Sequence, residues 1–238
     1  MIGRSSSETG VKIYLEAALT ADAFVVAKAE NAADFAPITY EFLSQAYTLY
    51  EETITESKAQ QRCISSMVGT LLVLRSLSKE DYESLITKTA QFSAKVMKKP
   101  DQCQLVALCA HLFYPASQGE DMKYSNPQRA LECLQRSLKL ADACTSANPS
   151  NVGLFVDLLE HYIYFFEKKN PVIKDGYITG LLALIKEHVN NAGTVGGDSS
   201  ASDAKAQFLE VVRYIKRMKG GETTAAMFAP IQVDDVGA

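Results

Sequence analysis

Along most of the chain, apolar residues recur at intervals of three and four, which is the spacing of one face of an α-helix. The segment after Pro37 is typical, with Phe42, Leu43, Ala46 and Tyr47 on one stripe. No stretch shows the alternation of apolar and polar residues that indicates a half-buried strand. The pattern therefore predicts an all-α protein.

Helix-start signals divide this pattern into segments of ordinary helix length. Ser78 is a good N-cap followed by two acids, and Pro100 and Pro127 occupy first-turn positions. We expect nine helices, which begin near residues 11, 37, 56, 79, 100, 127, 149, 175 and 203. Short connections make successive helices antiparallel, and every second start lies about 42–54 residues further on, near the period of HEAT-like repeats. The sequence thus predicts a HEAT-like α-solenoid of about nine antiparallel helices, with a compact bundle as the alternative.

The same pattern predicts the domain organisation. Residues 1–190 are expected to form the helical hairpins of the solenoid, and within them residues 1–10 are expected to be disordered or extraneous to the fold. Residues 191–202 are rich in glycine and serine and are expected to form a flexible linker. Residues 203–219 are expected to form a terminal helix, and residues 220–238 a disordered tail.

Composition narrows the functional classes. The formal net charge of −4 argues against bulk binding to nucleic acid or to an anionic membrane. The polar N-terminus lacks the apolar core of a signal peptide, and no apolar run has the length of a membrane span. Five cysteines without tight spacing are typical of reduced thiols. We therefore expect a cytoplasmic, soluble protein.

Motifs for catalysis or metal binding are missing from the sequence. It contains no glycine-rich phosphate loop, no Gly-x-Ser-x-Gly and no His-Glu-x-x-His. A metal site would need Cys103, Cys109 and His111 to converge, and helical spacing does not bring them together. The prediction is a protein that is not an enzyme and has no metal and no cofactor.

Two expected helices are apolar on all sides. In the helix of residues 152–169, Phe155, Leu158 and Tyr162 belong to the core stripe, while Ile163 and Tyr164 lie on other faces. Either such a helix is sandwiched between neighbours, or some of its aromatic residues line a groove for a partner. The helix of residues 100–115 allows the same two interpretations.

Charges suggest a specific surface. Glu51 and Glu52 lie at the C-terminal end of one helix, and Lys88, Lys95 and Lys99 share a face of a later one, with Lys98 beside them. These two helices are the same member of successive hairpins, so their ends should lie on one rim. An acidic end beside a basic end is self-complementary about a two-fold axis. The alternative is that the lysines complement their own helix dipole and remain solvated.

Seven stretches carry a resemblance to a known family. They are residues 40–52 (YEFLSQAYTLYEE), 57–60 (SKAQ), 98–102 (KKPDQ), 109–113 (CAHLF), 132–134 (ECL), 138–141 (LKLA) and 162–168 (YIYFFEK). In order and spacing they resemble the C-terminal part of the large α-solenoid subunit of retromer, number thirty-five of the vacuolar protein sorting series. The resemblance covers about residues 11–190 of the chain. It implies a C-terminal piece of a longer subunit.

The resemblance implies a function. Retromer is a peripheral coat on endosomal membranes that sorts transmembrane cargo in retrograde transport. The C-terminal solenoid of the family binds a small subunit with a metallophosphoesterase-like fold and pairs with itself through acidic and lysine clusters. These clusters fall on Glu51 and Glu52, and on Lys95, Lys98 and Lys99, and the family pattern has an acid at the position of Thr53. Nucleic acid and direct membrane insertion are not implied.

Helical facing alone suggests where the small subunit binds. We expect its contacts on exposed aromatic and polar positions of the two all-apolar helices, at His111, Tyr114, His161 and Tyr164. A stand-alone helical peptide-binding adaptor, comparable to the fourteen-three-three family, is the alternative function. Such a protein needs a cluster of basic residues and tyrosine to hold phosphate, and the arginines of this chain are scattered.

Overall fold

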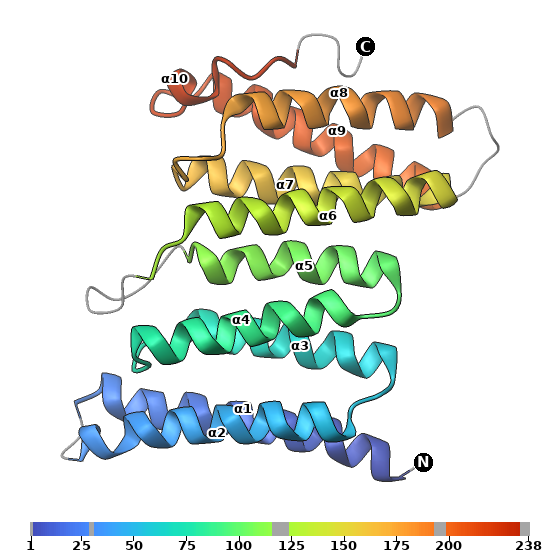
Figure 1. The fold of residues 1–238 in the computed structure, drawn as a ribbon. Helices are drawn as coiled ribbons and strands as arrows, with labels where there is room; N and C mark the ends of the chain where they lie inside the picture. The colour runs from blue at the N-terminus through green and yellow to red at the C-terminus, as the bar shows by residue number, and fades with distance from the viewer. Residues whose placement is uncertain (1, 29–30, 116–123, 193–198, 234–238) are drawn as a thin grey trace. The chain divides into compact units, whose positions relative to one another are not determined.

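The computed structural model of the chain describes residues 2–28, 31–115, 124–192 and 199–233 (Figure 1). These residues form ten α-helices and one 3₁₀ turn, and no strand occurs among them. In order the elements are α1 (Ile2–Val26), α2 (Ala32–Thr53), α3 (Ser57–Val73), α4 (Lys79–Lys95), α5 (Lys99–Phe113), α6 (Pro127–Ala147), η1 (Pro149–Val152), α7 (Gly153–Glu167), α8 (Asp175–Ala192), α9 (Ser199–Lys219) and α10 (Ala225–Phe228). The predicted all-α, solenoid-type fold class is confirmed.

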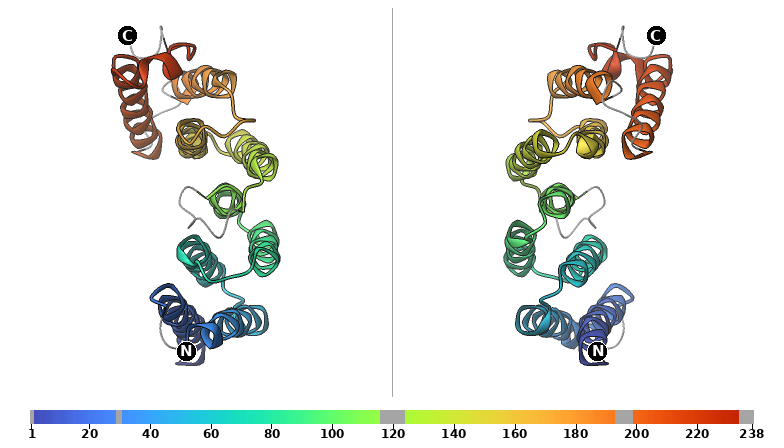
Figure 2. Two further views of the ribbon diagram at one scale, coloured as in Figure 1. Left: turned by 90° about the vertical axis from the view of Figure 1, so that its left-hand side faces the viewer. Right: turned by 90° about the vertical axis from the view of Figure 1, so that its right-hand side faces the viewer.

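The helices group into two compact units, Met1–Ala130 and Leu131–Ala238, so that the boundary falls within α6. In the first unit, α1 packs on α2 and α3, and α5 packs on α3 and α4. Figure 2 shows α1 and α3 of this unit in one row and α2 and α4 in the other. This is the two-layer arrangement of antiparallel helical hairpins.

Buried tyrosines connect α4 to α2 and to α5. Tyr47 of α2 is fully buried and its hydroxyl bonds to that of Thr89 on α4. Tyr82 of α4 donates to the carbonyl of Leu112 on α5 at 3.1 Å. A buried phenol contributes apolar area while its hydroxyl still requires a partner, so each tyrosine fixes the register of two helices.

An acid that the sequence analysis did not single out connects α1 to a distant turn. Asp22 is 6% exposed, and its Oδ1 accepts from the backbone N–H of Arg75 at 2.9 Å and of Ser76 at 2.7 Å. These two N–H groups lie in the connection that follows α3, which is thereby held against α1.

In the second unit, α7 packs on both α8 and α9. Its buried side chains come from all round the helix and include Phe155, Leu158, Tyr162, Ile163 and Phe165. The structure therefore supports the interpretation of α7 as a helix sandwiched between neighbours, since only a few of its positions remain for a partner.

Two boundaries in the first unit differ from the predicted ones. α2 begins at Ala32 with Pro37 inside it, because Phe35 stacks on Phe24 at 4.9 Å and extends the helix. α4 ends at Lys95 instead of continuing to residue 99, because Val96 turns to an extended conformation and is buried. Lys98 and Lys99 therefore belong to the start of α5 rather than to α4.

The predicted disorder at the two ends is replaced by structure in the described residues. α1 begins at Ile2, and the chain beyond α9 forms α10 and buries Phe228, Ile231 and Val233. The ring of Phe228 meets that of Phe166 edge-on at 5.6 Å, which anchors the segment to α7. The predicted linker narrows, since α8 extends to Ala192 and α9 begins at Ser199, and residues 193–198 lie outside the described residues.

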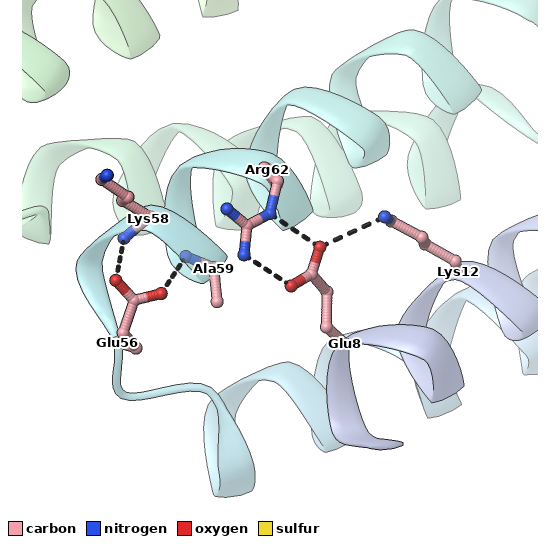
Figure 3. Close-up of polar contacts among 6 residues, drawn as sticks. All are labelled: Glu8, Lys12, Glu56, Lys58, Ala59 and Arg62. Carbon is pink, nitrogen blue, oxygen red and sulfur yellow. Dashed lines mark hydrogen bonds and ion pairs between the residues drawn. The ribbon is translucent and has the colours of Figure 1, made fainter. Parts of the chain in front are cut away.

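An ion-paired carboxylate explains why the first turns of α1 are ordered. Glu8 receives two parallel hydrogen bonds from Arg62 of α3, each 2.8 Å long, and Lys12 lies 3.1 Å away (Figure 3). The bidentate geometry is the strongest form of an arginine–carboxylate contact. These bonds join α1 to α3 at a point that local sequence does not reveal.

The same ion pair predicts acid sensitivity. The Arg62 hydrogen bonds lower the pKa of Glu8 to about 2, from an ordinary value of 4.5, against the opposing effect of burial. A carboxyl whose pKa is lower in the folded state stabilises the fold above its unfolded pKa, and that contribution is lost as the pH falls through the folded pKa. We expect the melting temperature to fall more steeply between about pH 4.5 and pH 2 in the wild type than in Glu8→Gln. Lys12→Gln is the control because it leaves the Arg62 contact intact, and parallel profiles for wild type and Glu8→Gln would contradict this assignment.

Candidate functional site

The charged rim of the first unit is made of the end of α2 and the connection between α4 and α5. We define the charged rim by its acids, Glu51 and Glu52, and its lysines, Lys88, Lys95, Lys98 and Lys99. α2 ends here because Ile54 is extended and buried, while the hydroxyl of Thr53 donates to the carbonyl of Leu49 at 2.6 Å. Thr53 is thus an uncharged last residue of α2, and its hydroxyl is bonded within the helix.

The turn into α3 completes the acidic side. Glu56 is the N-cap of α3, and its two carboxylate oxygens accept from the N–H groups of Lys58 at 3.0 Å and Ala59 at 2.8 Å (Figure 3). These backbone hydrogen bonds lower the pKa of Glu56. Gln60 then donates to the carbonyl of Ile54 at 3.2 Å. The connection between α2 and α3, which follows Glu51 and Glu52, is therefore fixed by the hydrogen bonds of Glu56 and Gln60.

A pocket of about 320 Å³, which we call the rim pocket, lies between the acidic and basic sides. Tyr50, Ile54, Phe92 and Val96 form its apolar part, and the rings of Tyr50 and Phe92 lie 4.6 Å apart. Its remaining lining residues are Glu51, Gln60 and Lys95. Glu51 and Lys95 thus line one pocket, as expected for helices whose ends lie on one rim.

One acid of the charged rim already forms an ion pair with a lysine of the same chain. Lys88 Nζ lies 2.8 Å from Glu51 Oε2, with both side chains partly exposed. The same ammonium lies 5.8 Å from the centre of the Tyr47 ring and 5.7 Å from that of Phe92. Within the described residues, Glu52, Lys95 and Lys98 form no ion pair, and all three are exposed.

The basic side is held by a buried glutamine. Gln102 is 4% exposed, its amide donates to the carbonyl of Ala94 at the end of α4, and Lys99 Nζ donates to its oxygen at 3.0 Å. Lys98 is the N-cap of α5 and Lys99 its first residue, and Pro100 follows in the first turn. The lysines therefore project from a fixed turn.

The four residues predicted to bind a small partner divide between the two units. His111 lies on α5 and Tyr114 directly follows it in the first unit, and His161 and Tyr164 lie on α7 in the second. All four are half-buried. Burial lowers the pKa of His161, while the nearby Asp157 acts in the opposite direction.

Tyr164 lines the larger of the two hollows described here. This groove, which we call the α7–α9 groove, has a volume of about 650 Å³. The residues that α7 contributes are Glu160, Ile163, Tyr164 and Glu167, and those of α9 are Glu210, Val211, Arg213, Tyr214 and Arg217. His161 is not among the lining residues, although it lies on the same helix.

Polar contacts across the α7–α9 groove hold its walls. Gln207 of α9 donates to Glu160 at 3.0 Å, and the Tyr214 hydroxyl donates to Glu167. Burial, and then the contact with Glu167, raises the pKa of Tyr214 to about 12. Arg217 covers the Tyr214 ring at 5.3 Å. The result is a groove with aromatic and carboxylate walls, suited to the side chains of a protein partner.

The α9 side of the groove was missed by the sequence analysis. Its residues at 210, 211, 213, 214 and 217 follow helical spacing and form one face. The spacing in the sequence could have predicted this face, but no local sequence pattern indicated that the face packs toward α7. Only the packing of the two helices reveals the groove.

Neither a cluster of metal ligands nor a membrane-spanning helix occurs in the part of the chain that the structure describes. Nowhere among them do three or more histidine, cysteine or acidic side chains gather closely enough to hold a metal ion. None of the helices that the structure describes is both long and apolar enough to cross a bilayer.

Comparison with known proteins places the chain in a family. The family model described as vacuolar protein sorting-associated protein 35 matches residues 1–188. Vacuolar protein sorting-associated protein 35 of Schizosaccharomyces pombe is 38% identical over 97% of this chain and 27% of its own length. Protein 35B of Arabidopsis thaliana is 36% identical over 90% of this chain and 26% of its own length. The chain thus spans about a quarter of these relatives, and it belongs to the vacuolar protein sorting-associated protein 35 family.

Proposed function

We propose that this chain is the C-terminal part of a non-catalytic scaffold subunit of retromer. In this role it binds the metallophosphoesterase-fold small subunit, associates with a second copy of itself, and acts in endosomal cargo sorting and retrograde transport. It would work in the cytoplasm, peripherally on endosomal membranes. Membership of the vacuolar protein sorting-associated protein 35 family is the single observation that carries this proposal.

The two surfaces described above are our candidates for the two contacts. The α7–α9 groove, with Tyr164 on its wall, is the candidate for the small subunit. His161 on the same helix, and His111 and Tyr114 in the first unit, remain proposed contacts. Aromatic side chains in a hollow with a polar edge are typical of protein interfaces. The charged rim is the candidate for self-association, with Glu51, Glu52, Lys95, Lys98 and Lys99 as its proposed contacts.

Complex formation with the small subunit tests the first contact. We expect the chain to co-elute with the purified retromer metallophosphoesterase-fold subunit in size-exclusion chromatography, and light scattering to give equal copy numbers of the two proteins. Tyr164→Ala should weaken binding by at least about tenfold in calorimetry, because an aromatic anchor is lost. Tyr177→Ala is the matched control, since Tyr177 is a partly exposed tyrosine of α8 in the same unit.

The outcomes separate the proposal from its alternative. Absence of any complex at micromolar concentrations would contradict the scaffold function and favour a stand-alone peptide-binding adaptor. Binding that Tyr164→Ala and Tyr177→Ala leave equally unchanged would keep the function and move the contact away from the groove.

A further inference from the structure

Met97 is an apolar side chain displayed to solvent at the centre of the charged rim. It is 87% exposed, more than any other large hydrophobic residue in the described part of the chain. Its neighbour Val96 is 2% exposed, and the buried Gln102 bonds to the end of α4. The turn is therefore anchored on both sides of Met97, and the exposure of its side chain results from a fixed backbone.

The rim pocket next to Met97 has the chemistry that a thioether prefers. Its apolar part consists of two aromatic rings, an isoleucine and a valine, each no more than 6% exposed, so that a partner meets their edges. Methionine sulfur makes favourable contacts with ring edges. An unbranched side chain adapts to an irregular hollow of about 320 Å³. Met97 does not fill the pocket of its own chain, because it is exposed while Lys95 and Val96 line that pocket.

A projecting side chain and a hollow on one small patch form a self-complementary pair. Under a two-fold axis, each copy presents Met97 to the partner and receives the partner's in return. The charges allow this exchange. Met97 is followed in the chain by Lys98 and Lys99, while Glu51 lines the pocket together with Lys95, and Glu52 follows Glu51. Lys98 and Glu52 are exposed and form no ion pair among the described residues, so Lys98 of one copy is available to Glu52 of the other.

We infer that Met97 is the apolar anchor of self-association and that it enters the rim pocket of a second copy of this chain. This inference rests on the self-association proposed above and adds an apolar residue to a contact otherwise formed by charges. Apolar anchors at the centre of a charged ring are the usual hot spots of interfaces, while the exposed charges around them contribute mainly to rate and specificity.

Sedimentation equilibrium of the full chain tests the anchor. Met97→Ser should raise the dimer dissociation constant by at least about tenfold, whereas Met97→Leu, which keeps the apolar volume, should stay close to the wild-type value. Val73→Ser is the matched control because Val73 is 62% exposed on α3 and does not line the rim pocket. Met97 makes no buried contact within its own chain, so melting curves should show Met97→Ser to be folded.

A photo-crosslinker tests where the side chain goes. With p-benzoylphenylalanine in place of Met97, irradiation of a mixture of isotopically labelled and unlabelled chains should crosslink position 97 to the partner's pocket, between residues 50 and 60 or near residue 92. Crosslinks that form only within one chain, or only outside the pocket, would overturn the inference.

The outcomes also distinguish this inference from the function on which it rests. A wild-type chain that stays monomeric at all concentrations would reject self-association and the anchor together. A wild-type dimer whose dissociation constant is unchanged in Met97→Ser would reject the anchor alone and leave a purely electrostatic contact.

Discussion

Replacing Leu158 by aspartate is expected to unfold the second unit. Leu158 is 1% exposed on α7, the helix that packs against both α8 and α9. An aspartate there would bury an ionised carboxylate without a partner and would also remove the apolar contacts of the leucine. We expect the free energy of unfolding to fall by about 4 kcal/mol or more, a large fraction of the stability of a domain of this size.

Two further variants identify the cause of that loss. Leu158→Ala leaves a cavity without a charge and should cost about 2–5 kcal/mol. Val73→Asp makes the same aliphatic-to-acid change at an exposed position and should stay within about 0.5 kcal/mol of the wild type. Circular dichroism during thermal and urea unfolding measures all three, and a Leu158→Asp protein that melts like the wild type would show that α7 is not the core helix of its unit.

Reversing the three lysines of the charged rim is expected to abolish self-association under conditions where the wild type is dimeric. In the variant Lys95→Glu, Lys98→Glu, Lys99→Glu, each copy would present acid to the partner's Glu51 and Glu52. Like charges across an interface cost several kcal/mol, which corresponds to a dissociation constant raised by about a hundredfold or more. The lysines are exposed, so helical content should not change.

A matched triple variant and a rescue make the test specific. Lys205→Glu, Lys216→Glu, Lys219→Glu changes the net charge equally on α9, in the other unit, and should leave self-association intact. Glu52→Lys mixed with the rim variant should restore a heterodimer because acid again meets base. Glu51 is spared in the rescue because it is paired with Lys88 in its own chain. Equal dissociation constants for the two triple variants would reject the charged rim as the contact.

Much of the candidate site could be predicted because it depends on local chemistry. Pro100 and the N-cap Ser78 mark helix starts that the structure confirms, with α4 beginning at Lys79 and α5 at Lys99. Once these helices are placed, the run of lysines must lie where α4 ends and α5 begins. The length of α4 was wrong by four residues, since the burial of Val96 outweighs the helix propensity of the lysines around it.

Other features could not be predicted because their partners are far apart in sequence. The order of α1 depends on the contact of Arg62 with Glu8 across 54 residues. Residues 220–233 of the tail are ordered because Phe228 packs against Phe166, and residues 234–238 lie outside the described residues. Polar N-terminal residues and a glycine-containing tail are ordinary signs of disorder. Those signs fail here because a tertiary contact offsets the entropy of ordering the segment.

By itself, the sequence determined that this protein is a series of antiparallel helices, and its residue patterns determined the family. It also determined which residues carry charge and where most helices begin, because caps, prolines and apolar spacing act within a few residues. The tertiary structure alone decided that Lys88 forms an ion pair with Glu51. It also decided that Tyr50 and Phe92 line a common pocket near the exposed Met97. Finally, it decided that one face of α9 packs toward α7. These features arise between helices that are distant in sequence, and the free energy of packing them together sets their relative positions, which no local pattern encodes.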